Sequence, residues 1–211
     1  MTVALLSPPR DRVPAEFIGL ARAFRGRVAD ADVGVIDVIR ATSRQLVERM
    51  GRHPVPRAET LAGIVRAWRT TAPFARISLS STFERKTLAI VETRVASHSY
   101  HDADWQQDAL EPGISVVRIS LAIAPRTRPA LSFATLCAVS LHALGRRFER
   151  GHPIDDDAII ADIAALAAPL DVEDGPIAVP VPDGRWLGSM VEVRKRSGAT
   201  ERIASARTFV T

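Results

Sequence analysis

The hydrophobic period changes along this chain, and that change restricts the fold more than any other feature of the sequence. Apolar residues recur at helical spacing up to about residue 71 and alternate at every second position over 77–124. They return to helical spacing over 133–168 and alternate again over 177–210. A period of about 3.6 predicts amphipathic helices, and a period of two predicts half-buried strands. The sequence therefore predicts an α+β fold with N-terminal helices, central antiparallel strands, a helix pair and a C-terminal antiparallel β-meander.

The helical first third reads as three separate helices. Pro14 suits a first helical turn and Gly26 is typical of a helix end, so the first helix is predicted between them. The second is predicted over 32–50, and the third follows Pro56 and ends at Pro73. Because the period changes at 70–75, we expect a helical region at 1–74 and an α+β domain at 75–211. The two are also compatible with one continuous domain.

The second half alternates between the two periods. One helix is predicted over 133–150 and stopped by Gly151, and the next begins after Asp155, a natural N-cap. Asp183-Gly184 predicts a hairpin turn. The predicted strands are 77–82, 87–96, 114–123, 177–181, 186–194 and 202–210. The predicted shared core consists of Leu141, Leu144, Phe148, Ile159, Ile163 and Trp186.

Composition excludes several classes of protein. No apolar run approaches the ~18 residues of a membrane span, and the N-terminus lacks a basic leader, so we expect a cytoplasmic protein. The lone Cys137 cannot form an internal disulfide, and its apolar helical surroundings favour a buried thiol over a nucleophile. No phosphate-binding loop, Rossmann fingerprint or nucleophile elbow is present, so we expect no cofactor. All but two of the 28 basic residues are arginine, as in a bacterial protein from a GC-rich genome, but the formal charge is only +4.

A polar segment contains a weak candidate for a metal site. His98, His101, Asp102 and Asp104 lie within seven residues of one another, and imidazole and carboxylate groups can ligate a divalent cation. The spacing fits no standard zinc pattern, and one loop would have to supply every ligand. A polar loop with incidental histidines is therefore the preferred interpretation, and no metal is predicted.

A stronger candidate for catalysis lies on the predicted helix over 133–150. His142, Arg146 and Arg150 are spaced four residues apart and form one row along a helix, away from the apolar stripe. An imidazole can transfer a proton near neutral pH, and arginine stabilises charge that develops on phosphorus. This combination suits phosphodiester chemistry. The alternative interpretation is that the arginines solvate the helix end, where cations interact favourably with the helix dipole.

The segment from His142 onward resembles small RelE-like and BrnT-like toxins of the barnase/EndoU/RelE ribonuclease group. The resemblance rests on a His-Ala-x-x-Arg-x-x-x-Arg-Gly helix (residues 142–151), a second helix, antiparallel strands and Arg207-Thr208-Phe209. It implies metal-independent RNA cleavage, in which the ribose 2′-hydroxyl attacks the phosphate. His142 would then act as general acid or base, Arg146 and Arg207 would stabilise the phosphate, and Thr208 would supply a hydrogen bond.

Two classes of function remain open at this stage, and whether the protein is an enzyme is one of the open questions. In the first class, His142 and the arginines converge in a cleft that cleaves RNA. In the second class, the protein is a non-catalytic module that binds nucleic acid or protein. Its partner would be RNA, an antitoxin-like protein or a second copy of the chain. The position of His142 relative to Arg207 and Thr208 distinguishes the two classes.

Overall fold

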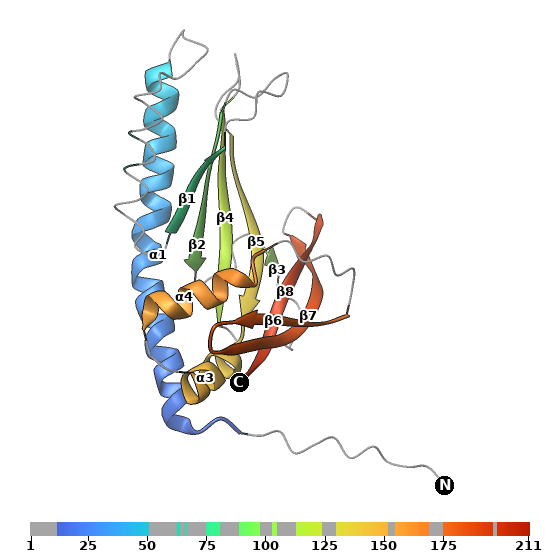
Figure 1. The fold of residues 1–211 in the computed structure, drawn as a ribbon. Coiled ribbons are helices and arrows are strands. Elements are labelled where there is room, and N and C mark those ends of the chain that lie inside the picture. The colour runs from blue at the N-terminus through green and yellow to red at the C-terminus, as the bar shows by residue number, and fades with distance from the viewer. Residues whose placement is uncertain are drawn as a thin grey trace.

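The fold is α+β, with helices packed against a mixed sheet (Figure 1). The strands that are described form one eight-stranded sheet in the order β1-β2-β4-β5-β8-β7-β3, and β6 also pairs with β7. No helix among the described residues is long and apolar enough to cross a membrane. The computed structural model describes residues 12–50, 63, 66, 75–80, 89–97, 103–104, 113–123, 130–151, 155–168, 175–195 and 198–211.

One long helix, α1 (Ala15–Met50), replaces the first two predicted helices. The predicted end at Gly26 was wrong. Gly26 is exposed, and no atom lies within 4 Å of the position that a Cβ would occupy. A glycine inside a helix costs only about 1 kcal/mol relative to alanine, and burial of Phe24 and Val28 on either side of it offsets that cost. Of the third predicted helix only Gly63 and Arg66 are described, and both are helical.

The central strands are antiparallel neighbours, as predicted. They are β1 (Ala75–Ser80), β2 (Ala89–Ser97) and β4 (Ile114–Ile123), and β4 has the predicted bounds. A two-residue strand, β3 (Ala103–Asp104), lies inside the predicted polar loop and pairs with β7. The candidate metal ligands His98, His101 and Asp102 lie outside the described residues.

The predicted helix over 133–150 was half wrong, because its first part is strand β5 (Ala130–Val139). This segment pairs antiparallel with β4 and parallel with β8, and the second pairing joins residues far apart in the chain. The helix itself, α3 (Leu141–Arg150), starts after Ser140, whose hydroxyl accepts a hydrogen bond from the Ala143 amide at 3.1 Å. Cys137 is buried as expected, but it lies on a strand.

The next helix and the C-terminal strands confirm the sequence prediction. Helix α4 (Asp156–Ala165) begins at the predicted N-cap, Asp155, and α3 ends at Gly151. Strands β6 (Gly175–Val181), β7 (Gly184–Lys195) and β8 (Thr200–Val210) form an antiparallel meander. Gly184 follows the two-residue turn with φ 154°, and a Cβ there would lie 2.3 Å from the Val210 carbonyl oxygen. The turn therefore requires glycine at this position.

The predicted core is confirmed, and α1 contributes to it. All six predicted core residues belong to one buried cluster, which also contains Ala21, Phe24 and Val28 of α1. The Phe24 and Phe148 rings meet edge to face, with their centroids 6.1 Å apart. A bidentate ion pair between Arg27 and Asp156 joins α1 to the start of α4. Helix α3 therefore lies between α1 and the C-terminal strands, and this placement determines the candidate site.

Candidate binding face of the C-terminal strands

The arginines of the predicted catalytic row on α3 are occupied by contacts within the protein. Arg146 is buried, and its Nη1 donates to the Glu149 carboxylate at 2.5 Å. Arg150 is half-buried and donates to the Phe209 carbonyl oxygen at 3.1 Å. His142 is half-buried on the same row. Arg146 is therefore paired within α3, Arg150 joins α3 to β8, and both guanidinium groups already have partners in the protein.

The two predicted residues on β8, Arg207 and Thr208, lie beside an irregularity in the strand. Leu187 pairs with Thr208 and the next residue of β7, Gly188, pairs with Ala206, so Arg207 is left without a partner. Such a bulge places two residues opposite one and redirects their side chains. Arg207 is exposed and Thr208 half-buried, whereas Ala206 and Phe209, which flank them, are completely buried.

The five predicted site residues are consequently divided between the two sides of β8. Ala206 and Phe209 belong to the core cluster that contains Leu144 and Phe148 of α3, so α3 covers the inner side of the strand. The Ser140 amide also donates to the Ala206 carbonyl oxygen at 3.1 Å. The fold thus brings α3 against β8, but Arg207 and Thr208 lie on the side of β8 away from the buried cluster.

We call the part of that other side nearest the β6–β7 turn the outer face; farther along β7 and β8 the same side is buried at Val193 and Ile203 and carries Glu201. Strand residues alternate between the two sides of a sheet, and the buried residues Ile177, Val179 and Trp186 mark the inner side. Pro180 pairs with Arg185, and Ala178 pairs with Leu187. The exposed or half-buried residues of the outer face are Pro176, Ala178, Pro180, Arg185, Leu187, Ser189, Arg207, Thr208 and Val210.

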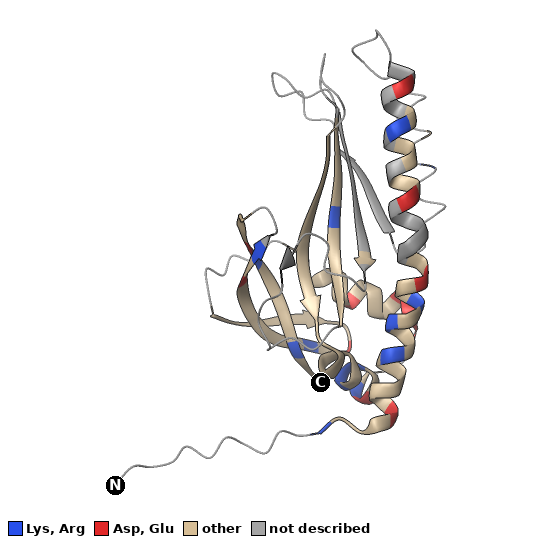
Figure 2. Cartoon of the chain, turned by 180° about the vertical axis from the view of Figure 1, so that it is seen from behind, with Lys and Arg blue, Asp and Glu red and all other residues tan. Residues whose placement is uncertain are grey.

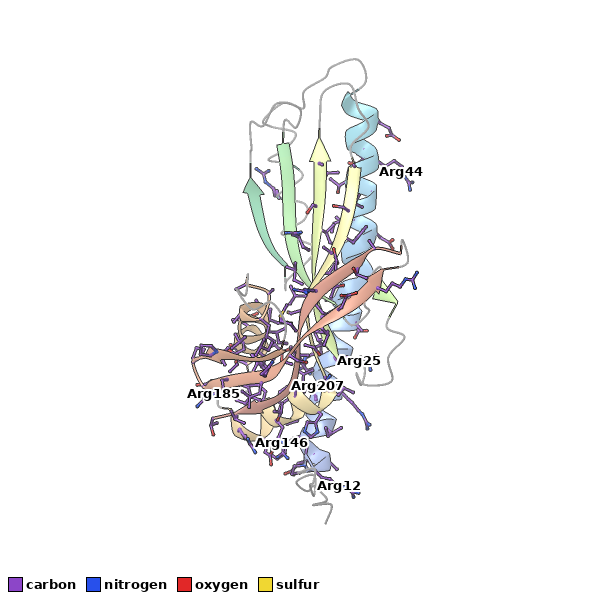
Figure 3. All side chains as sticks on the ribbon, turned by 90° about the vertical axis from the view of Figure 1, so that its right-hand side faces the viewer. Arg12, Arg25, Arg44, Arg146, Arg185 and Arg207 are labelled. Atoms are coloured by element: carbon purple, nitrogen blue, oxygen red, sulfur yellow. The ribbon has the colours of Figure 1, made fainter. Side chains whose placement is uncertain are left out.

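The outer face carries two exposed cations. Arg185 and Arg207 are exposed, and within the described part of the chain neither forms an ion pair. None of the outer-face residues just named is acidic, and Asp183 in the adjoining turn bonds to Arg147 instead. Figure 3 shows Arg185 and Arg207 on the C-terminal strands and Arg44 far from them on α1. Along α1, by contrast, both basic and acidic residues are present (Figure 2).

A shallow depression adjoins Arg185 at the hairpin end of the outer face. Its volume is about 520 Å³. The lining residues are Ala178, Pro180, Val181, Pro182, Gly184, Arg185 and Thr211. Arg185 is the only cation among these residues, so the depression offers an apolar floor beside one guanidinium group.

The free edge of β6 is poorly suited to pairing with a strand of another protein. Pro176 and Pro180 have no amide hydrogen to donate, and both are exposed. Proline on an edge strand blocks the pairing that would otherwise extend the sheet. A partner would therefore have to bind the outer face through side chains.

One buried arginine of the site region was missed by the sequence analysis. Arg147, next to the predicted Arg146, is almost fully buried and joins three other elements of the fold. Its Nε donates to Asp162 at 2.7 Å, its Nη2 donates to Asp183 at 2.9 Å, and its guanidinium carbon lies 5.2 Å from the centre of the Phe209 ring. Burial raises the pKa of the Asp162 carboxyl above its ordinary value of 3.8, although the hydrogen bond and charge of Arg147 act in the opposite direction.

The chain matches no protein-family model, no curated protein and no solved structure.

Proposed function

We propose that this protein is a non-catalytic nucleic-acid-binding module that contacts the phosphate backbone with the outer face of β6–β8. RNA is the first ligand to test. The observation that carries the proposal is the bulge in β8, which places Arg207 and Thr208 on the same side as Arg185. Two exposed guanidinium groups, which have no ion pair to another described residue, and an adjacent hydroxyl are groups that bind phosphate oxygens.

The composition of the outer face favours contacts to phosphates over contacts to bases. None of its residues is aromatic, so it lacks the rings on which unpaired bases usually stack. Arginine binds phosphate with two parallel N–H groups and needs no particular base sequence. We therefore expect weak, sequence-independent binding that falls steeply as salt is added, since each neutralised phosphate releases counterions.

The ribonuclease hypothesis requires its five residues to converge in one site, whereas the fold divides them between the two sides of β8. A general acid or base must reach the proton it transfers, at about 2.6–3.2 Å or through one water molecule. His142 lies on the helix that packs on the inner side of β8, whereas Arg207 is exposed on the outer side. Arg146, the other proposed phosphate ligand, is paired with Glu149. Binding requires only the residues that already lie together on the outer face, so binding is the function proposed.

The proposal is tested by fluorescence anisotropy with a labelled single-stranded RNA over a series of salt concentrations. Arg185→Ala and Arg207→Ala should each weaken binding about three- to tenfold, which lies within the net contribution of about 0.5–1.5 kcal/mol of a typical hydrogen bond. Each change should also make the fall of log affinity with log salt concentration less steep, by about 1 in the slope.

Arg44→Ala is the matched control for this experiment. Arg44 is exposed on α1 and lacks an ion pair among the described residues, so its loss changes the net charge equally. It should leave binding close to that of the parent. Equal losses in all three variants would show that only net charge matters, and a parent protein that does not bind RNA would refute the proposal.

A further inference from the structure

We infer that Arg147 is a positioning residue, which holds the β6–β7 hairpin from the inner side and so fixes Arg185 on the outer face. This inference rests on the proposed function. Arg147 contacts neither RNA nor solvent, since only 2% of its side chain is exposed. Its action on binding would be indirect, through the turn that Arg185 follows.

The chain around Arg185 is anchored on both sides. Two residues before it, Asp183 accepts a hydrogen bond from Arg147 Nη2 at 2.9 Å. Immediately after it, the Trp186 indole nitrogen donates to the Asp162 carbonyl oxygen at 3.0 Å. Arg147 also bonds to the Asp162 carboxylate, so both anchors meet at the same pair of buried residues. Arg185 is thus held between two fixed neighbours.

The packing around Arg147 leaves the guanidinium little freedom to move. A Cβ at Gly151 would lie 1.5 Å from Arg147 Nη1, so the end of α3 closes tightly over it. On another side is the Phe209 ring, which meets Trp186 edge to face at 4.9 Å. A planar guanidinium that bonds two carboxylates fixes their relative position, which a lysine ammonium group cannot reproduce.

A pair of variants at Asp183 separates positioning from charge. Asp183→Asn removes the charge but keeps an oxygen that can accept from Arg147, whereas Asp183→Ala removes both. The side chain of Asp183 is 36% exposed, so neither change should unfold the protein. On charge alone, both variants should bind RNA at least as well as the parent. Positioning instead predicts that Asp183→Ala binds about three- to tenfold more weakly than Asp183→Asn.

Two further measurements complete the experiment. In an Arg185→Ala background the affinity difference between the two Asp183 variants should vanish, because the side chain that is positioned is gone. Amide hydrogen exchange over residues 184–187 should be faster in Asp183→Ala than in Asp183→Asn, and this readout requires no ligand. Equal exchange in the two variants would overturn the positioning role. If exchange differs but the parent does not bind RNA, the proposed function fails and the positioning of the hairpin stands.

Discussion

The two sides of β7 and β8 use arginine in opposite ways. On the inner side, Arg146 and Arg147 are buried, and their charges are compensated by carboxylates. On the outer side, Arg185 and Arg207 are exposed and have no ion pair among the described residues. A buried charge must be paired because desolvation is expensive, whereas an exposed charge can remain available to a ligand.

This difference shows that an arginine-rich composition is not itself a functional signal. The charges of the inner arginines are cancelled locally by Glu149, Asp162 and Asp183. Of these four arginines, only Arg185 and Arg207 add to the electrostatic field that a polyanion meets outside the protein. Counting arginines along the sequence does not separate the two groups.

The largest effect on any measured rate is the one that the ribonuclease hypothesis predicts for RNA cleavage. Observing it would contradict the assignment of binding to the outer side. If His142 were a general acid or base, the parent would cleave RNA in the presence of a chelator, and His142→Ala would slow cleavage about 10²–10⁴-fold. The binding proposal predicts intact RNA after prolonged incubation with either protein, followed on a gel. Cleavage that depends on His142 would make the inner side the functional one.

The next largest effect concerns stability and distinguishes the two sides directly. Arg147→Met should lower the free energy of unfolding by about 3–5 kcal/mol, because it leaves the Asp162 carboxylate buried without its partner. Arg185→Met, the control on the outer side, should change it by no more than about 0.5 kcal/mol. Urea denaturation measures both values. Similar values for the two variants would remove the distinction between the sides.

The inner side should also be sensitive to loss of apolar volume. Leu144→Ala or Phe148→Ala should each cost about 2–5 kcal/mol, since both side chains lie in the core between α1 and the strands. Leu20→Ala is the control, because Leu20 lies 39% exposed on α1. Denaturation midpoints equal to that of the parent for both core variants would contradict the packing described above.

The smallest expected effect is a dependence of the free energy of unfolding on pH, which reports on the buried pair of Arg147 and Asp162. Because burial raises the pKa of Asp162 in the folded protein, the folded state takes up a proton before the unfolded state does. The resulting stabilisation is complete below the ordinary value of 3.8 and is lost as the pH rises through the folded pKa. The free energy of unfolding of the parent, taken relative to that of Asp162→Asn, should therefore increase on acidification. A decrease in this relative value would mean that the attraction of Arg147 outweighs burial.

Local patterns in the sequence predicted the type of most described elements. Alternation over residues 177–210 identified β6, β7 and β8. Gly151 marked the end of α3, and Asp155 marked the start of α4. These signals succeed because capping and alternation act between residues close in the chain. Two errors arose where the local signal was ambiguous. Gly26 is weak as a helix breaker, and the apolar run 130–139 fits a strand as well as a helix.

The candidate site depended on contacts that local patterns do not encode. In a regular strand Arg207 and Thr208 would point to opposite sides, and the pairing with β7 creates the bulge that directs both away from the core. The sequence also could not distinguish Arg146 from Arg147, because the burial of each depends on how α3 packs between α1 and β8. The sequence by itself thus determined the type of most segments, and it failed at 130–139, where an apolar run fits either structure. The tertiary structure decided which arginines face the core and which face outward, because register and packing join residues far apart in the chain.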